Sequence, residues 1–226
     1  MHEILAHDSY VPRTYLPFAL PGGDSAWGCR FGGKPPEGVT PPFEPFLYLL
    51  TLQYSIEPHI EFSLFLNFSV SHKDEHFDIL MQNKYQMFDA ASPEGQDLVY
   101  VAVHDATGRN VDSEAPYLLP TSRLEYGEVA ADEIDDQFAI YRHHKVGGLP
   151  KFHYFKSSLA DPAQSLLVSG CTHLLQLSPP GPGDFAEPGV DGKVGWPDIP
   201  WPFGDFIFHL FLRIVNDKYV FYFGWA

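Results

Sequence analysis

The chain has 226 residues, a formal net charge of −15 and an aromatic fraction of 15%. Its hydrophobic fraction of 45% excludes an intrinsically disordered chain, because that much apolar surface can offset the entropy cost of folding. The negative charge disfavours direct binding to nucleic acid and favours a basic protein partner. No apolar stretch approaches the roughly 20 residues that a membrane span needs, so we expect no membrane association.

The compartment is predicted from the first residues and from the cysteines. Residues 1–8 lack a basic region followed by an apolar core, which favours a protein that is not exported. Cys29 and Cys171 match no metal-ligand or redox spacing, and we expect both to be reduced thiols. The expected location is the cytoplasm.

The fold class follows from the 19 glycines and 21 prolines, which are typical of many short strands joined by turns. We predict an α+β, β-rich fold with mainly antiparallel sheets and a few short helices. The length suits a single domain over residues 1–226.

In chain order, the first half begins with a Gly-Gly-x-Pro motif at Phe31–Pro35 and continues with the apolar run Leu49–Gln53. A strand is predicted over Glu61–Val70, with apolar residues on both faces. A helix is predicted over Glu75–Phe88 from its apolar spacing, followed by a strand over Leu98–Val103.

The second half repeats this order. A second Gly-Gly-x-Pro motif at Val146–Pro150 precedes Leu174–Gln176. Strands are then predicted over Phe206–Val215 and Tyr219–Trp225, joined by a hairpin turn at residues 216–218.

The shared order predicts an internal duplication, with halves at about 28–110 and 140–226 and an acidic connection over 111–139. In each motif a glycine can take positive φ and the proline fixes the exit of the turn, so we predict a structural role. The residues of this structural motif are Gly32, Gly33, Pro35, Gln53, Gly147, Gly148, Pro150 and Gln176.

The acidic connection is the candidate site for a partner. Residues 112–136 carry eight carboxylates against one base, Arg123, and also two tyrosines of the kind enriched at interfaces. The alternative is a solvated acidic loop between the halves. The candidate partner-binding residues are Asp112, Glu114, Tyr117, Glu125, Tyr126, Glu128, Asp132, Glu133, Asp135 and Asp136.

A competing hypothesis is a metal-dependent hydrolase. His72, Glu75 and His76 match the H-x-x-E-H pattern, in which two imidazoles one helical turn apart bind zinc and the Glu acts as base. That chemistry needs a helix through all five residues, whereas the residues before His72 favour a strand and Ser71 suits a helix N-cap. The alternative is a solvated helix start.

Other patterns are weaker. His104-Asp105 and His143-His144 could contribute to a metal or acid–base site only if the fold brought them together. Trp196, Trp201 and Tyr154 could line a small-ligand groove between the halves. No nucleophile motif or phosphate-binding loop is present, so we predict no catalytic residue, no metal and no cofactor.

Taken in order, the landmarks Phe31–Pro35, Leu50–Gln53, His144–Pro150, Leu174–Gln176 and Gly204-Asp205 resemble those of the YwqG-like family. The resemblance spans roughly residues 30–225. It implies an internally duplicated, mainly antiparallel α+β fold without an established catalytic activity.

Some members of this family resemble immunity proteins, which neutralise secreted interbacterial toxins. One branch is similar to the immunity partner of a type VI secretion effector whose toxin domain is a metal-dependent DNase of the GHH class. The resemblance therefore implies a protein–protein interaction with a toxin, and the acidity of the chain suits a partner whose DNA-binding surface is cationic.

Overall fold

The computed structural model describes residues 13–19, 30–32, 34–41, 46–54, 56–67, 82–106, 122–129, 144–148, 150, 160–177, 203 and 206–225. The strands are β1 (Arg13–Ala19), β2 (Arg30–Phe31), β3 (Phe46–Gln53), β4 (Ile60–Asn67), β5 (Met87–Asp89), β6 (Val99–Asp105), β7 (Ser122–Val129), β8 (His144–Val146), β9 (Thr172–Leu177), β10 (Phe208–Val215) and β11 (Lys218–Trp225). The helices are α2 (Pro93–Gln96) and α3 (Ala160–Val168).

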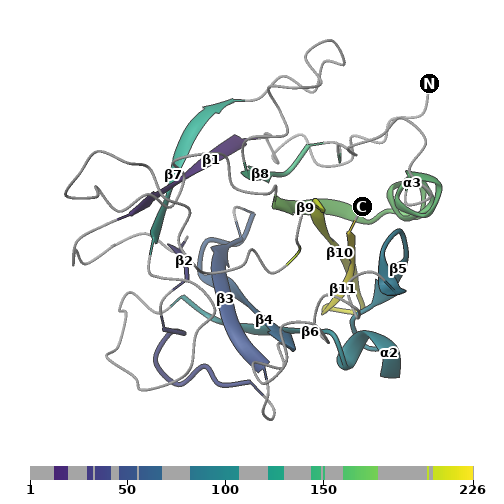
Figure 1. Cartoon of the computed structure of the whole chain (residues 1–226), viewed down its shortest axis with the longest axis horizontal. Coiled ribbons are helices and arrows are strands. Elements are labelled where there is room, and N and C mark those ends of the chain that lie inside the picture. Colours follow the sequence, from purple (N-terminus) through teal and green to yellow (C-terminus); the bar gives the residue numbers. More distant parts are fainter. Residues whose placement is uncertain are drawn as a thin grey trace.

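The strands of the described residues form one eleven-stranded sheet in which every pairing is antiparallel (Figure 1). The strand order is β5-β11-β10-β9-β8-β1-β7-β2-β3-β4-β6. The prediction of a β-rich, antiparallel fold with short helices is confirmed. Neither α2 nor α3, nor any other described helix, has the length and apolar character of a membrane span.

The strand order has the same form on both sides of the central β1–β7 pair. Outward from β7 come β2, β3, β4 and β6, and outward from β1 come β8, β9, β10 and β11. Each side therefore starts with a very short strand that leads into a Gly-Gly-x-Pro motif and continues with three strands in chain order, although β5 and α2 lie between β4 and β6 in the sequence. β5 is an additional strand beyond β11.

The two Gly-Gly-x-Pro turns make the same backbone contact. Gly32 has φ +66° and its N–H donates to the carbonyl of Leu49 at 2.7 Å, while Gly147 has φ +74° and donates to Leu174 at 3.1 Å. Both leucines lie at a register shift, Leu49 against β4 and Leu174 against β10, which is the position of a β-bulge. Positive φ costs glycine little, which explains the residue at both turns.

The register changes one detail of the sequence comparison. Arg30 of β2 lies opposite Thr51, and Lys145 of β8 lies opposite Gln176. Gln176 therefore occupies the place of Thr51 in the sheet. The sequence pattern predicts instead that Gln176 corresponds to Gln53, two residues after Thr51. The difference arises because the two sequence motifs match at their glutamines, whereas the two arms of the sheet match at the leucines of their β-bulges, Leu49 and Leu174.

The predicted C-terminal hairpin is confirmed. β10 and β11 pair along their whole length, from Phe208↔Trp225 to Val215↔Lys218. Asn216 and Asp217 form the turn with φ values of +50° and +59°, as a two-residue turn of type I′ requires.

The helix predicted over Glu75–Phe88 is wrong at its C-terminal end. Residues 82 and 83 are helical, but Tyr85 has φ +61° and Met87–Asp89 form β5. The N–H of Tyr85 donates to the carbonyl of Trp225 at 2.8 Å, so pairing with β11 competes with continuation of the helix. Residues 75–81 lie outside the described part of the chain.

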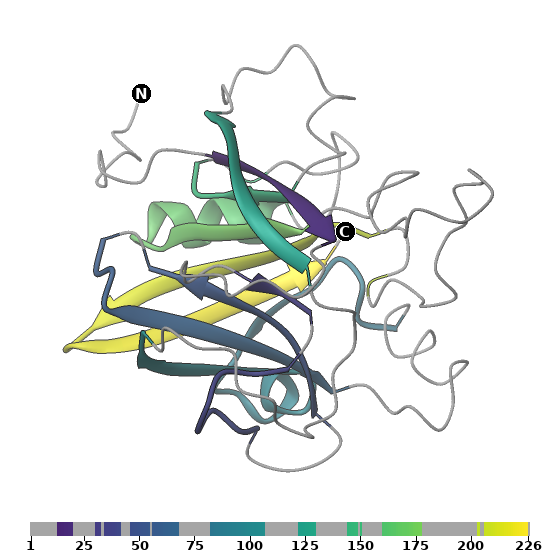
Figure 2. The ribbon, with the colours of Figure 1, turned by 90° about the vertical axis from the view of Figure 1, so that its left-hand side faces the viewer.

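The main core lies between two arms of the sheet, β3–β4–β6 and β9–β10–β11, which face each other as two layers in Figure 2. Phe62 of β4 bridges the arms, with ring centroids 5.2 Å from Phe221 and 5.5 Å from Tyr219 of β11. Leu64 and Leu66 of β4 belong to the same buried cluster. The sheet thus bends so that its aromatic and leucine side chains are covered from both sides.

The opposite face of each arm carries a smaller cluster. Phe65 packs with Phe46 and Tyr48 in one arm, which confirms that β4 is buried on both faces. In the other arm Phe211 packs against Ala163 and Leu167 of α3, which covers this face beside β9 and β10 (Figure 1).

Tyr54, directly after β3, makes the stability of the packing between the arms depend on pH. Its ring is 2% exposed and lies 5.2 Å from that of Phe62. Burial, with a smaller effect from the negative charge of Glu57, raises the pKa of Tyr54 to about 12. Since an unfolded tyrosine releases its proton near pH 10, the stabilisation is complete below about pH 10 and is lost as the pH rises towards 12.

We therefore expect the free energy of unfolding to fall by about 2 kcal/mol more between pH 10 and 12 in the wild type than in Tyr54→Phe. Urea unfolding at a series of pH values measures this difference, and tyrosinate absorbance follows the ionisation. Glu57→Gln should remove only part of the effect, because burial is the larger cause. Equal alkaline slopes for wild type and Tyr54→Phe would contradict the assignment.

Candidate functional site

The structure describes only part of the acidic connection. Among its candidate residues, Glu125, Tyr126 and Glu128 lie on β7, in the middle of the sheet, where Leu16 pairs with Glu125 and Tyr15 with Tyr126. Residues 122–129 are therefore a central strand, not a loop that only joins two halves. The remaining candidates lie outside the described residues: Asp112, Glu114, Tyr117, Asp132, Glu133, Asp135 and Asp136.

The residues of the competing hypotheses are mostly outside the described part. This is true of the zinc motif, His72, Glu75 and His76. It is also true of His143, Tyr154, Trp196 and Trp201. Within the described residues, no group of three or more His, Cys, Asp or Glu side chains is arranged to hold a metal ion.

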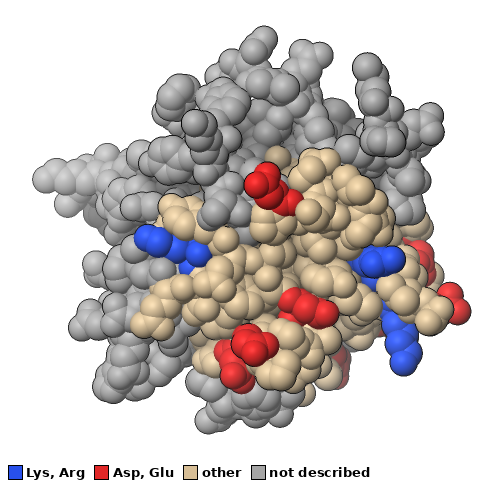
Figure 3. Space-filling view, turned by 90° about the vertical axis from the view of Figure 1, so that its right-hand side faces the viewer, with Lys and Arg blue, Asp and Glu red and all other residues tan. Residues whose placement is uncertain are grey.

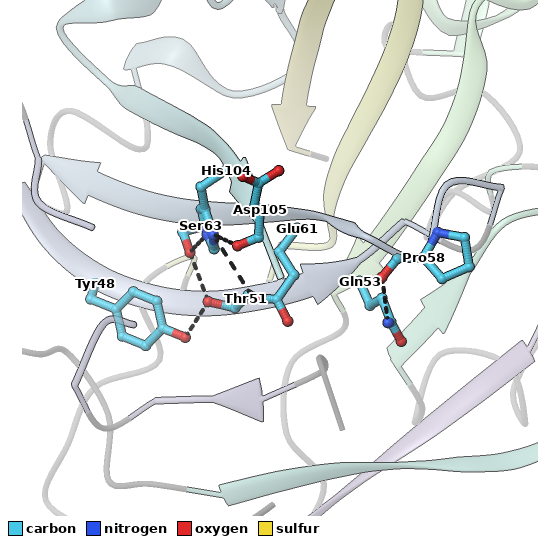
Figure 4. Close-up of polar contacts among 8 residues, drawn as sticks. All are labelled: Tyr48, Thr51, Gln53, Pro58, Glu61, Ser63, His104 and Asp105. Atoms are coloured by element: carbon cyan, nitrogen blue, oxygen red, sulfur yellow. Dashed lines mark hydrogen bonds and ion pairs between the residues drawn. The ribbon is translucent and has the colours of Figure 1, made fainter. Parts of the chain in front are cut away.

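A buried polar network lies on the outer face of the β3–β4–β6 arm (Figure 4). The Tyr48 hydroxyl lies 2.8 Å from Thr51 Oγ1, which lies 2.8 Å from Ser63 Oγ. Ser63 Oγ lies 2.8 Å from Nε2 of His104. Tyr48, Thr51 and Ser63 have no exposed surface, so the network crosses three strands inside the protein.

The last acceptor of the network, the carbonyl of Asp105, determines which groups donate and which accept. Nδ1 of His104 lies 2.9 Å from the carbonyl of Asp105, which can only accept. In the neutral ring Nδ1 therefore donates, Nε2 accepts from Ser63, and Ser63 accepts from Thr51. The network is a relay with one direction, from the Tyr48 hydroxyl to the Asp105 carbonyl.

Glu61 brings a carboxylate to this relay. It is 2% exposed, pairs with His104 across β4 and β6, and its Oε2 lies 3.8 Å from His104 Nδ1. The order Ser63–His104–Glu61 is that of a nucleophile, a base and an orienting acid. Ser63, however, has no exposed surface and already contacts Thr51, so its Oγ cannot meet a substrate in this conformation. The arrangement fits a structural network that fixes the register of three strands.

The other arm carries polar side chains at the matching places. Gln176 and His209 pair across β9 and β10 as Thr51 and Ser63 pair across β3 and β4. His173 Nδ1 lies 3.2 Å from the carbonyl of Gly148 and its Nε2 lies 3.4 Å from Nδ1 of His209. Because the carbonyl accepts, His173 Nδ1 donates and its Nε2 can accept from His209.

Of these polar residues, the sequence patterns singled out only Gln176, as part of the turn motif, and His104, as a candidate for a metal or acid–base site. The available signal was a polar residue inside an otherwise apolar strand, as with Ser63 between Phe62 and Leu64, or His209 between Phe208 and Leu210. Such a residue is buried only when it is hydrogen-bonded, so its presence indicates a partner on the neighbouring strand.

Figure 3 shows both carboxylates and cationic groups on the described part of one face, with several carboxylates near its lower centre and cationic groups to the left and right of them. The described residues of that face therefore form no extended patch of one sign. By contrast, residues 112–136 carry eight of the 29 acidic residues of the chain.

The chain matches no known family model, no curated protein and no solved structure in three separate comparisons.

Proposed function

We propose that this chain is a cytoplasmic immunity protein of YwqG-like type, which binds and neutralises a secreted antibacterial toxin, a metal-dependent DNase effector. The observation that carries the proposal is the charge of residues 112–136, with eight carboxylates against Arg123 in a protein of net charge −15. A DNase must bind a polyanion through a cationic surface, and clustered carboxylates compete for the same surface.

The fold supports this role through β7. Ser122–Val129 is fixed in the centre of the sheet between β1 and β2. Asp112 and Glu114 precede this strand in the sequence, and Asp132, Glu133, Asp135 and Asp136 follow it. β7 itself carries Glu125 and Glu128, so two carboxylates of the acidic stretch belong to a strand of the sheet.

The proposal includes an internal duplication of the scaffold. Its support is the strand order on the two sides of the β1–β7 pair, together with the equivalent Gly32–Leu49 and Gly147–Leu174 hydrogen bonds. Each repeat then begins with β1 or β7, earlier than the limits 28–110 and 140–226 that the motifs suggested. The proposed interaction surface for the toxin is the acidic stretch of residues 112–136, which includes β7.

The test is the association rate with a GHH-class nuclease domain encoded next to this chain. Replacing Asp135 and Asp136 with lysine should slow association about tenfold at low salt, because the steering charge is reversed at the interface. Replacing Glu37 and Asp161, which are exposed elsewhere, with lysine changes the net charge equally and is the matched control.

Stopped-flow fluorescence measures both rates, and nuclease activity measures neutralisation. Equal slowing by the two pairs would assign the effect to net charge alone and contradict an interface at the acidic connection. A complex that does not form, with the nuclease active in the presence of excess chain, would overturn the proposed function.

A further inference from the structure

The hairpin of β10 and β11 extends beyond its two neighbouring strands. Within the described part of the chain, β10 pairs with β9 up to Leu212, and β11 pairs with β5 from Tyr222 onwards. The two strands of the hairpin continue to pair with each other as far as Val215↔Lys218. Figure 2 shows this yellow hairpin reaching past the green strand β9. Residues 213–220 therefore form a projecting end of the sheet.

The side chains of this projecting end are open to solvent. All residues from Arg213 to Lys218 are exposed, including two apolar ones, Ile214 at 48% and Val215 at 38%. The next two residues of β11 are half-buried. The end of the hairpin is thus a surface that a partner can reach without any rearrangement of the sheet.

One face of the projecting end combines two cations with two valines. Residues that pair across two strands share a face, so Arg213 lies beside Val220, and Val215 lies beside Lys218. The same face continues along β10 to Phe211, which packs against α3. The four side chains form a square whose cations stand on one diagonal, about 7–8 Å apart at the backbone, and whose valines stand on the other. We call these four residues the cationic face.

The two cations keep their charge available. Among the described residues, no carboxylate forms an ion pair with Arg213 or Lys218, and the ion pair that is present there joins Glu61 to His104 in the other arm. Burial raises the pKa of Cys171 and of Tyr222, and the charge of Arg213 opposes both rises. The guanidinium therefore lies near these neutral groups of the same face.

The charge of the cationic face selects an acidic partner, although the whole chain carries −15. Two cations and the single carboxylate of Asp217 leave a net charge of +1 on residues 213–218. Charges more than about 8 Å away are largely screened at physiological ionic strength, so a partner at the projecting end responds mainly to these residues. In an extended segment, alternate side chains lie on one side about 6.5–7 Å apart, which matches the spacing of the two cations.

We propose that the cationic face is a docking surface for an acidic segment of another protein, with two carboxylates at alternate positions of an extended strand and an apolar residue on either side. Arg213 binds one carboxylate through its planar fork and Lys218 binds the other as a point charge. Val215 and Val220 provide apolar surface between them. The surface goes beyond the proposed immunity function, because it repels the cationic surface of a DNase.

The first test is an NMR titration of the full chain with a capped peptide, Ile-Thr-Glu-Thr-Glu-Thr-Ile. We expect weak binding, with a Kd of roughly 1 mM, because the contact is small and transient. The amide signals of residues 213–220 should shift. The matched peptide with glutamine in place of both glutamates should bind at least about fivefold more weakly. Equal binding of the two peptides, or shifts confined to other residues, would overturn the proposal.

The second test changes the charges of the protein. Lys218→Glu should weaken peptide binding about tenfold at low salt. Lys34→Glu, at a half-buried residue after β2, changes the net charge equally and should leave binding within about twofold. Asp217→Asn removes the carboxylate of the turn and should strengthen binding about twofold. Equal weakening by the two lysine variants, or a loss of affinity in Asp217→Asn, would assign binding to another site.

Two further measurements distinguish other occupants. A dimer in light scattering that dissociates in Lys218→Glu would place a second copy at the cationic face and would overturn the proposal. Tighter binding of a thymidine oligonucleotide than of the peptide would assign the two cations to phosphate groups, with the same consequence. Because these experiments contain no nuclease, their outcome is independent of whether the chain neutralises one.

Discussion

Replacing Phe62 with alanine is expected to lower the free energy of unfolding by about 4 kcal/mol, the largest effect that we predict for a single side chain. The ring is 1% exposed and contacts Tyr54 at 5.2 Å, Tyr219 at 5.5 Å and Phe221 at 5.2 Å between centroids. It therefore joins β4 of one arm to β11 of the other. Its loss removes apolar burial and leaves a cavity that aromatic neighbours in two layers cannot fill together.

Urea unfolding followed by tryptophan fluorescence and circular dichroism measures this cost. For a chain of this size it corresponds to a fall in Tm of roughly 10 °C. Ile214→Ala on β10 is the control, because Ile214 is 48% exposed and its truncation should cost less than about 1 kcal/mol. Similar costs for the two variants would mean that the arms are not held together by the aromatic contacts of Phe62.

Much of the sheet was predictable because its strands have strong local signals. The strands at residues 60–67, 99–105, 208–215 and 218–225 were predicted from β-branched and aromatic runs, and Asn216-Asp217 gave the hairpin. These features depend on neighbouring residues along the chain, so a single sequence carries them.

Other features depend on pairing between distant segments. The bulges at Leu49 and Leu174, which set the register of Gln176, have no local signature in a run of leucines. The end of the predicted helix at Tyr85 follows from the pairing of β5 with β11, about 135 residues further along the chain. β7 was missed because its carboxylates suggested a solvated connection.

The candidate site also combines features that the sequence predicts with features that depend on pairing between distant segments. Its charge is a property of the sequence, and the concentration of carboxylates in residues 112–136 was found without a structure. The relay through Tyr48, Thr51, Ser63 and His104 arises only when three strands are placed side by side. No spacing in the sequence brings Ser63 to His104.

The second large effect is expected at Gly95, a buried residue of α2. In an unobstructed helix, replacing glycine with alanine stabilises the helix by about 1 kcal/mol. Here a Cβ at Gly95 would collide with the backbone carbonyl of Asp89 and approach Cα of Ala90 to 3.2 Å. Neither group is the end of a flexible side chain, so the backbone itself has to move.

We therefore expect Gly95→Ala to destabilise the protein by about 3 kcal/mol, opposite in sign to the effect in a free helix. The segment that has to shift carries β5, so the exchange of the Ala90 amide, which donates to Phe221 at 2.9 Å, should accelerate with it. Gly38→Ala is the control, because it introduces backbone strain without a collision: Gly38 has φ +75° and open space around its Cβ position. That change should cost only about 1 kcal/mol. Stabilisation by Gly95→Ala would show that β5 and α2 are not packed as closely as the turn at Asp89 requires.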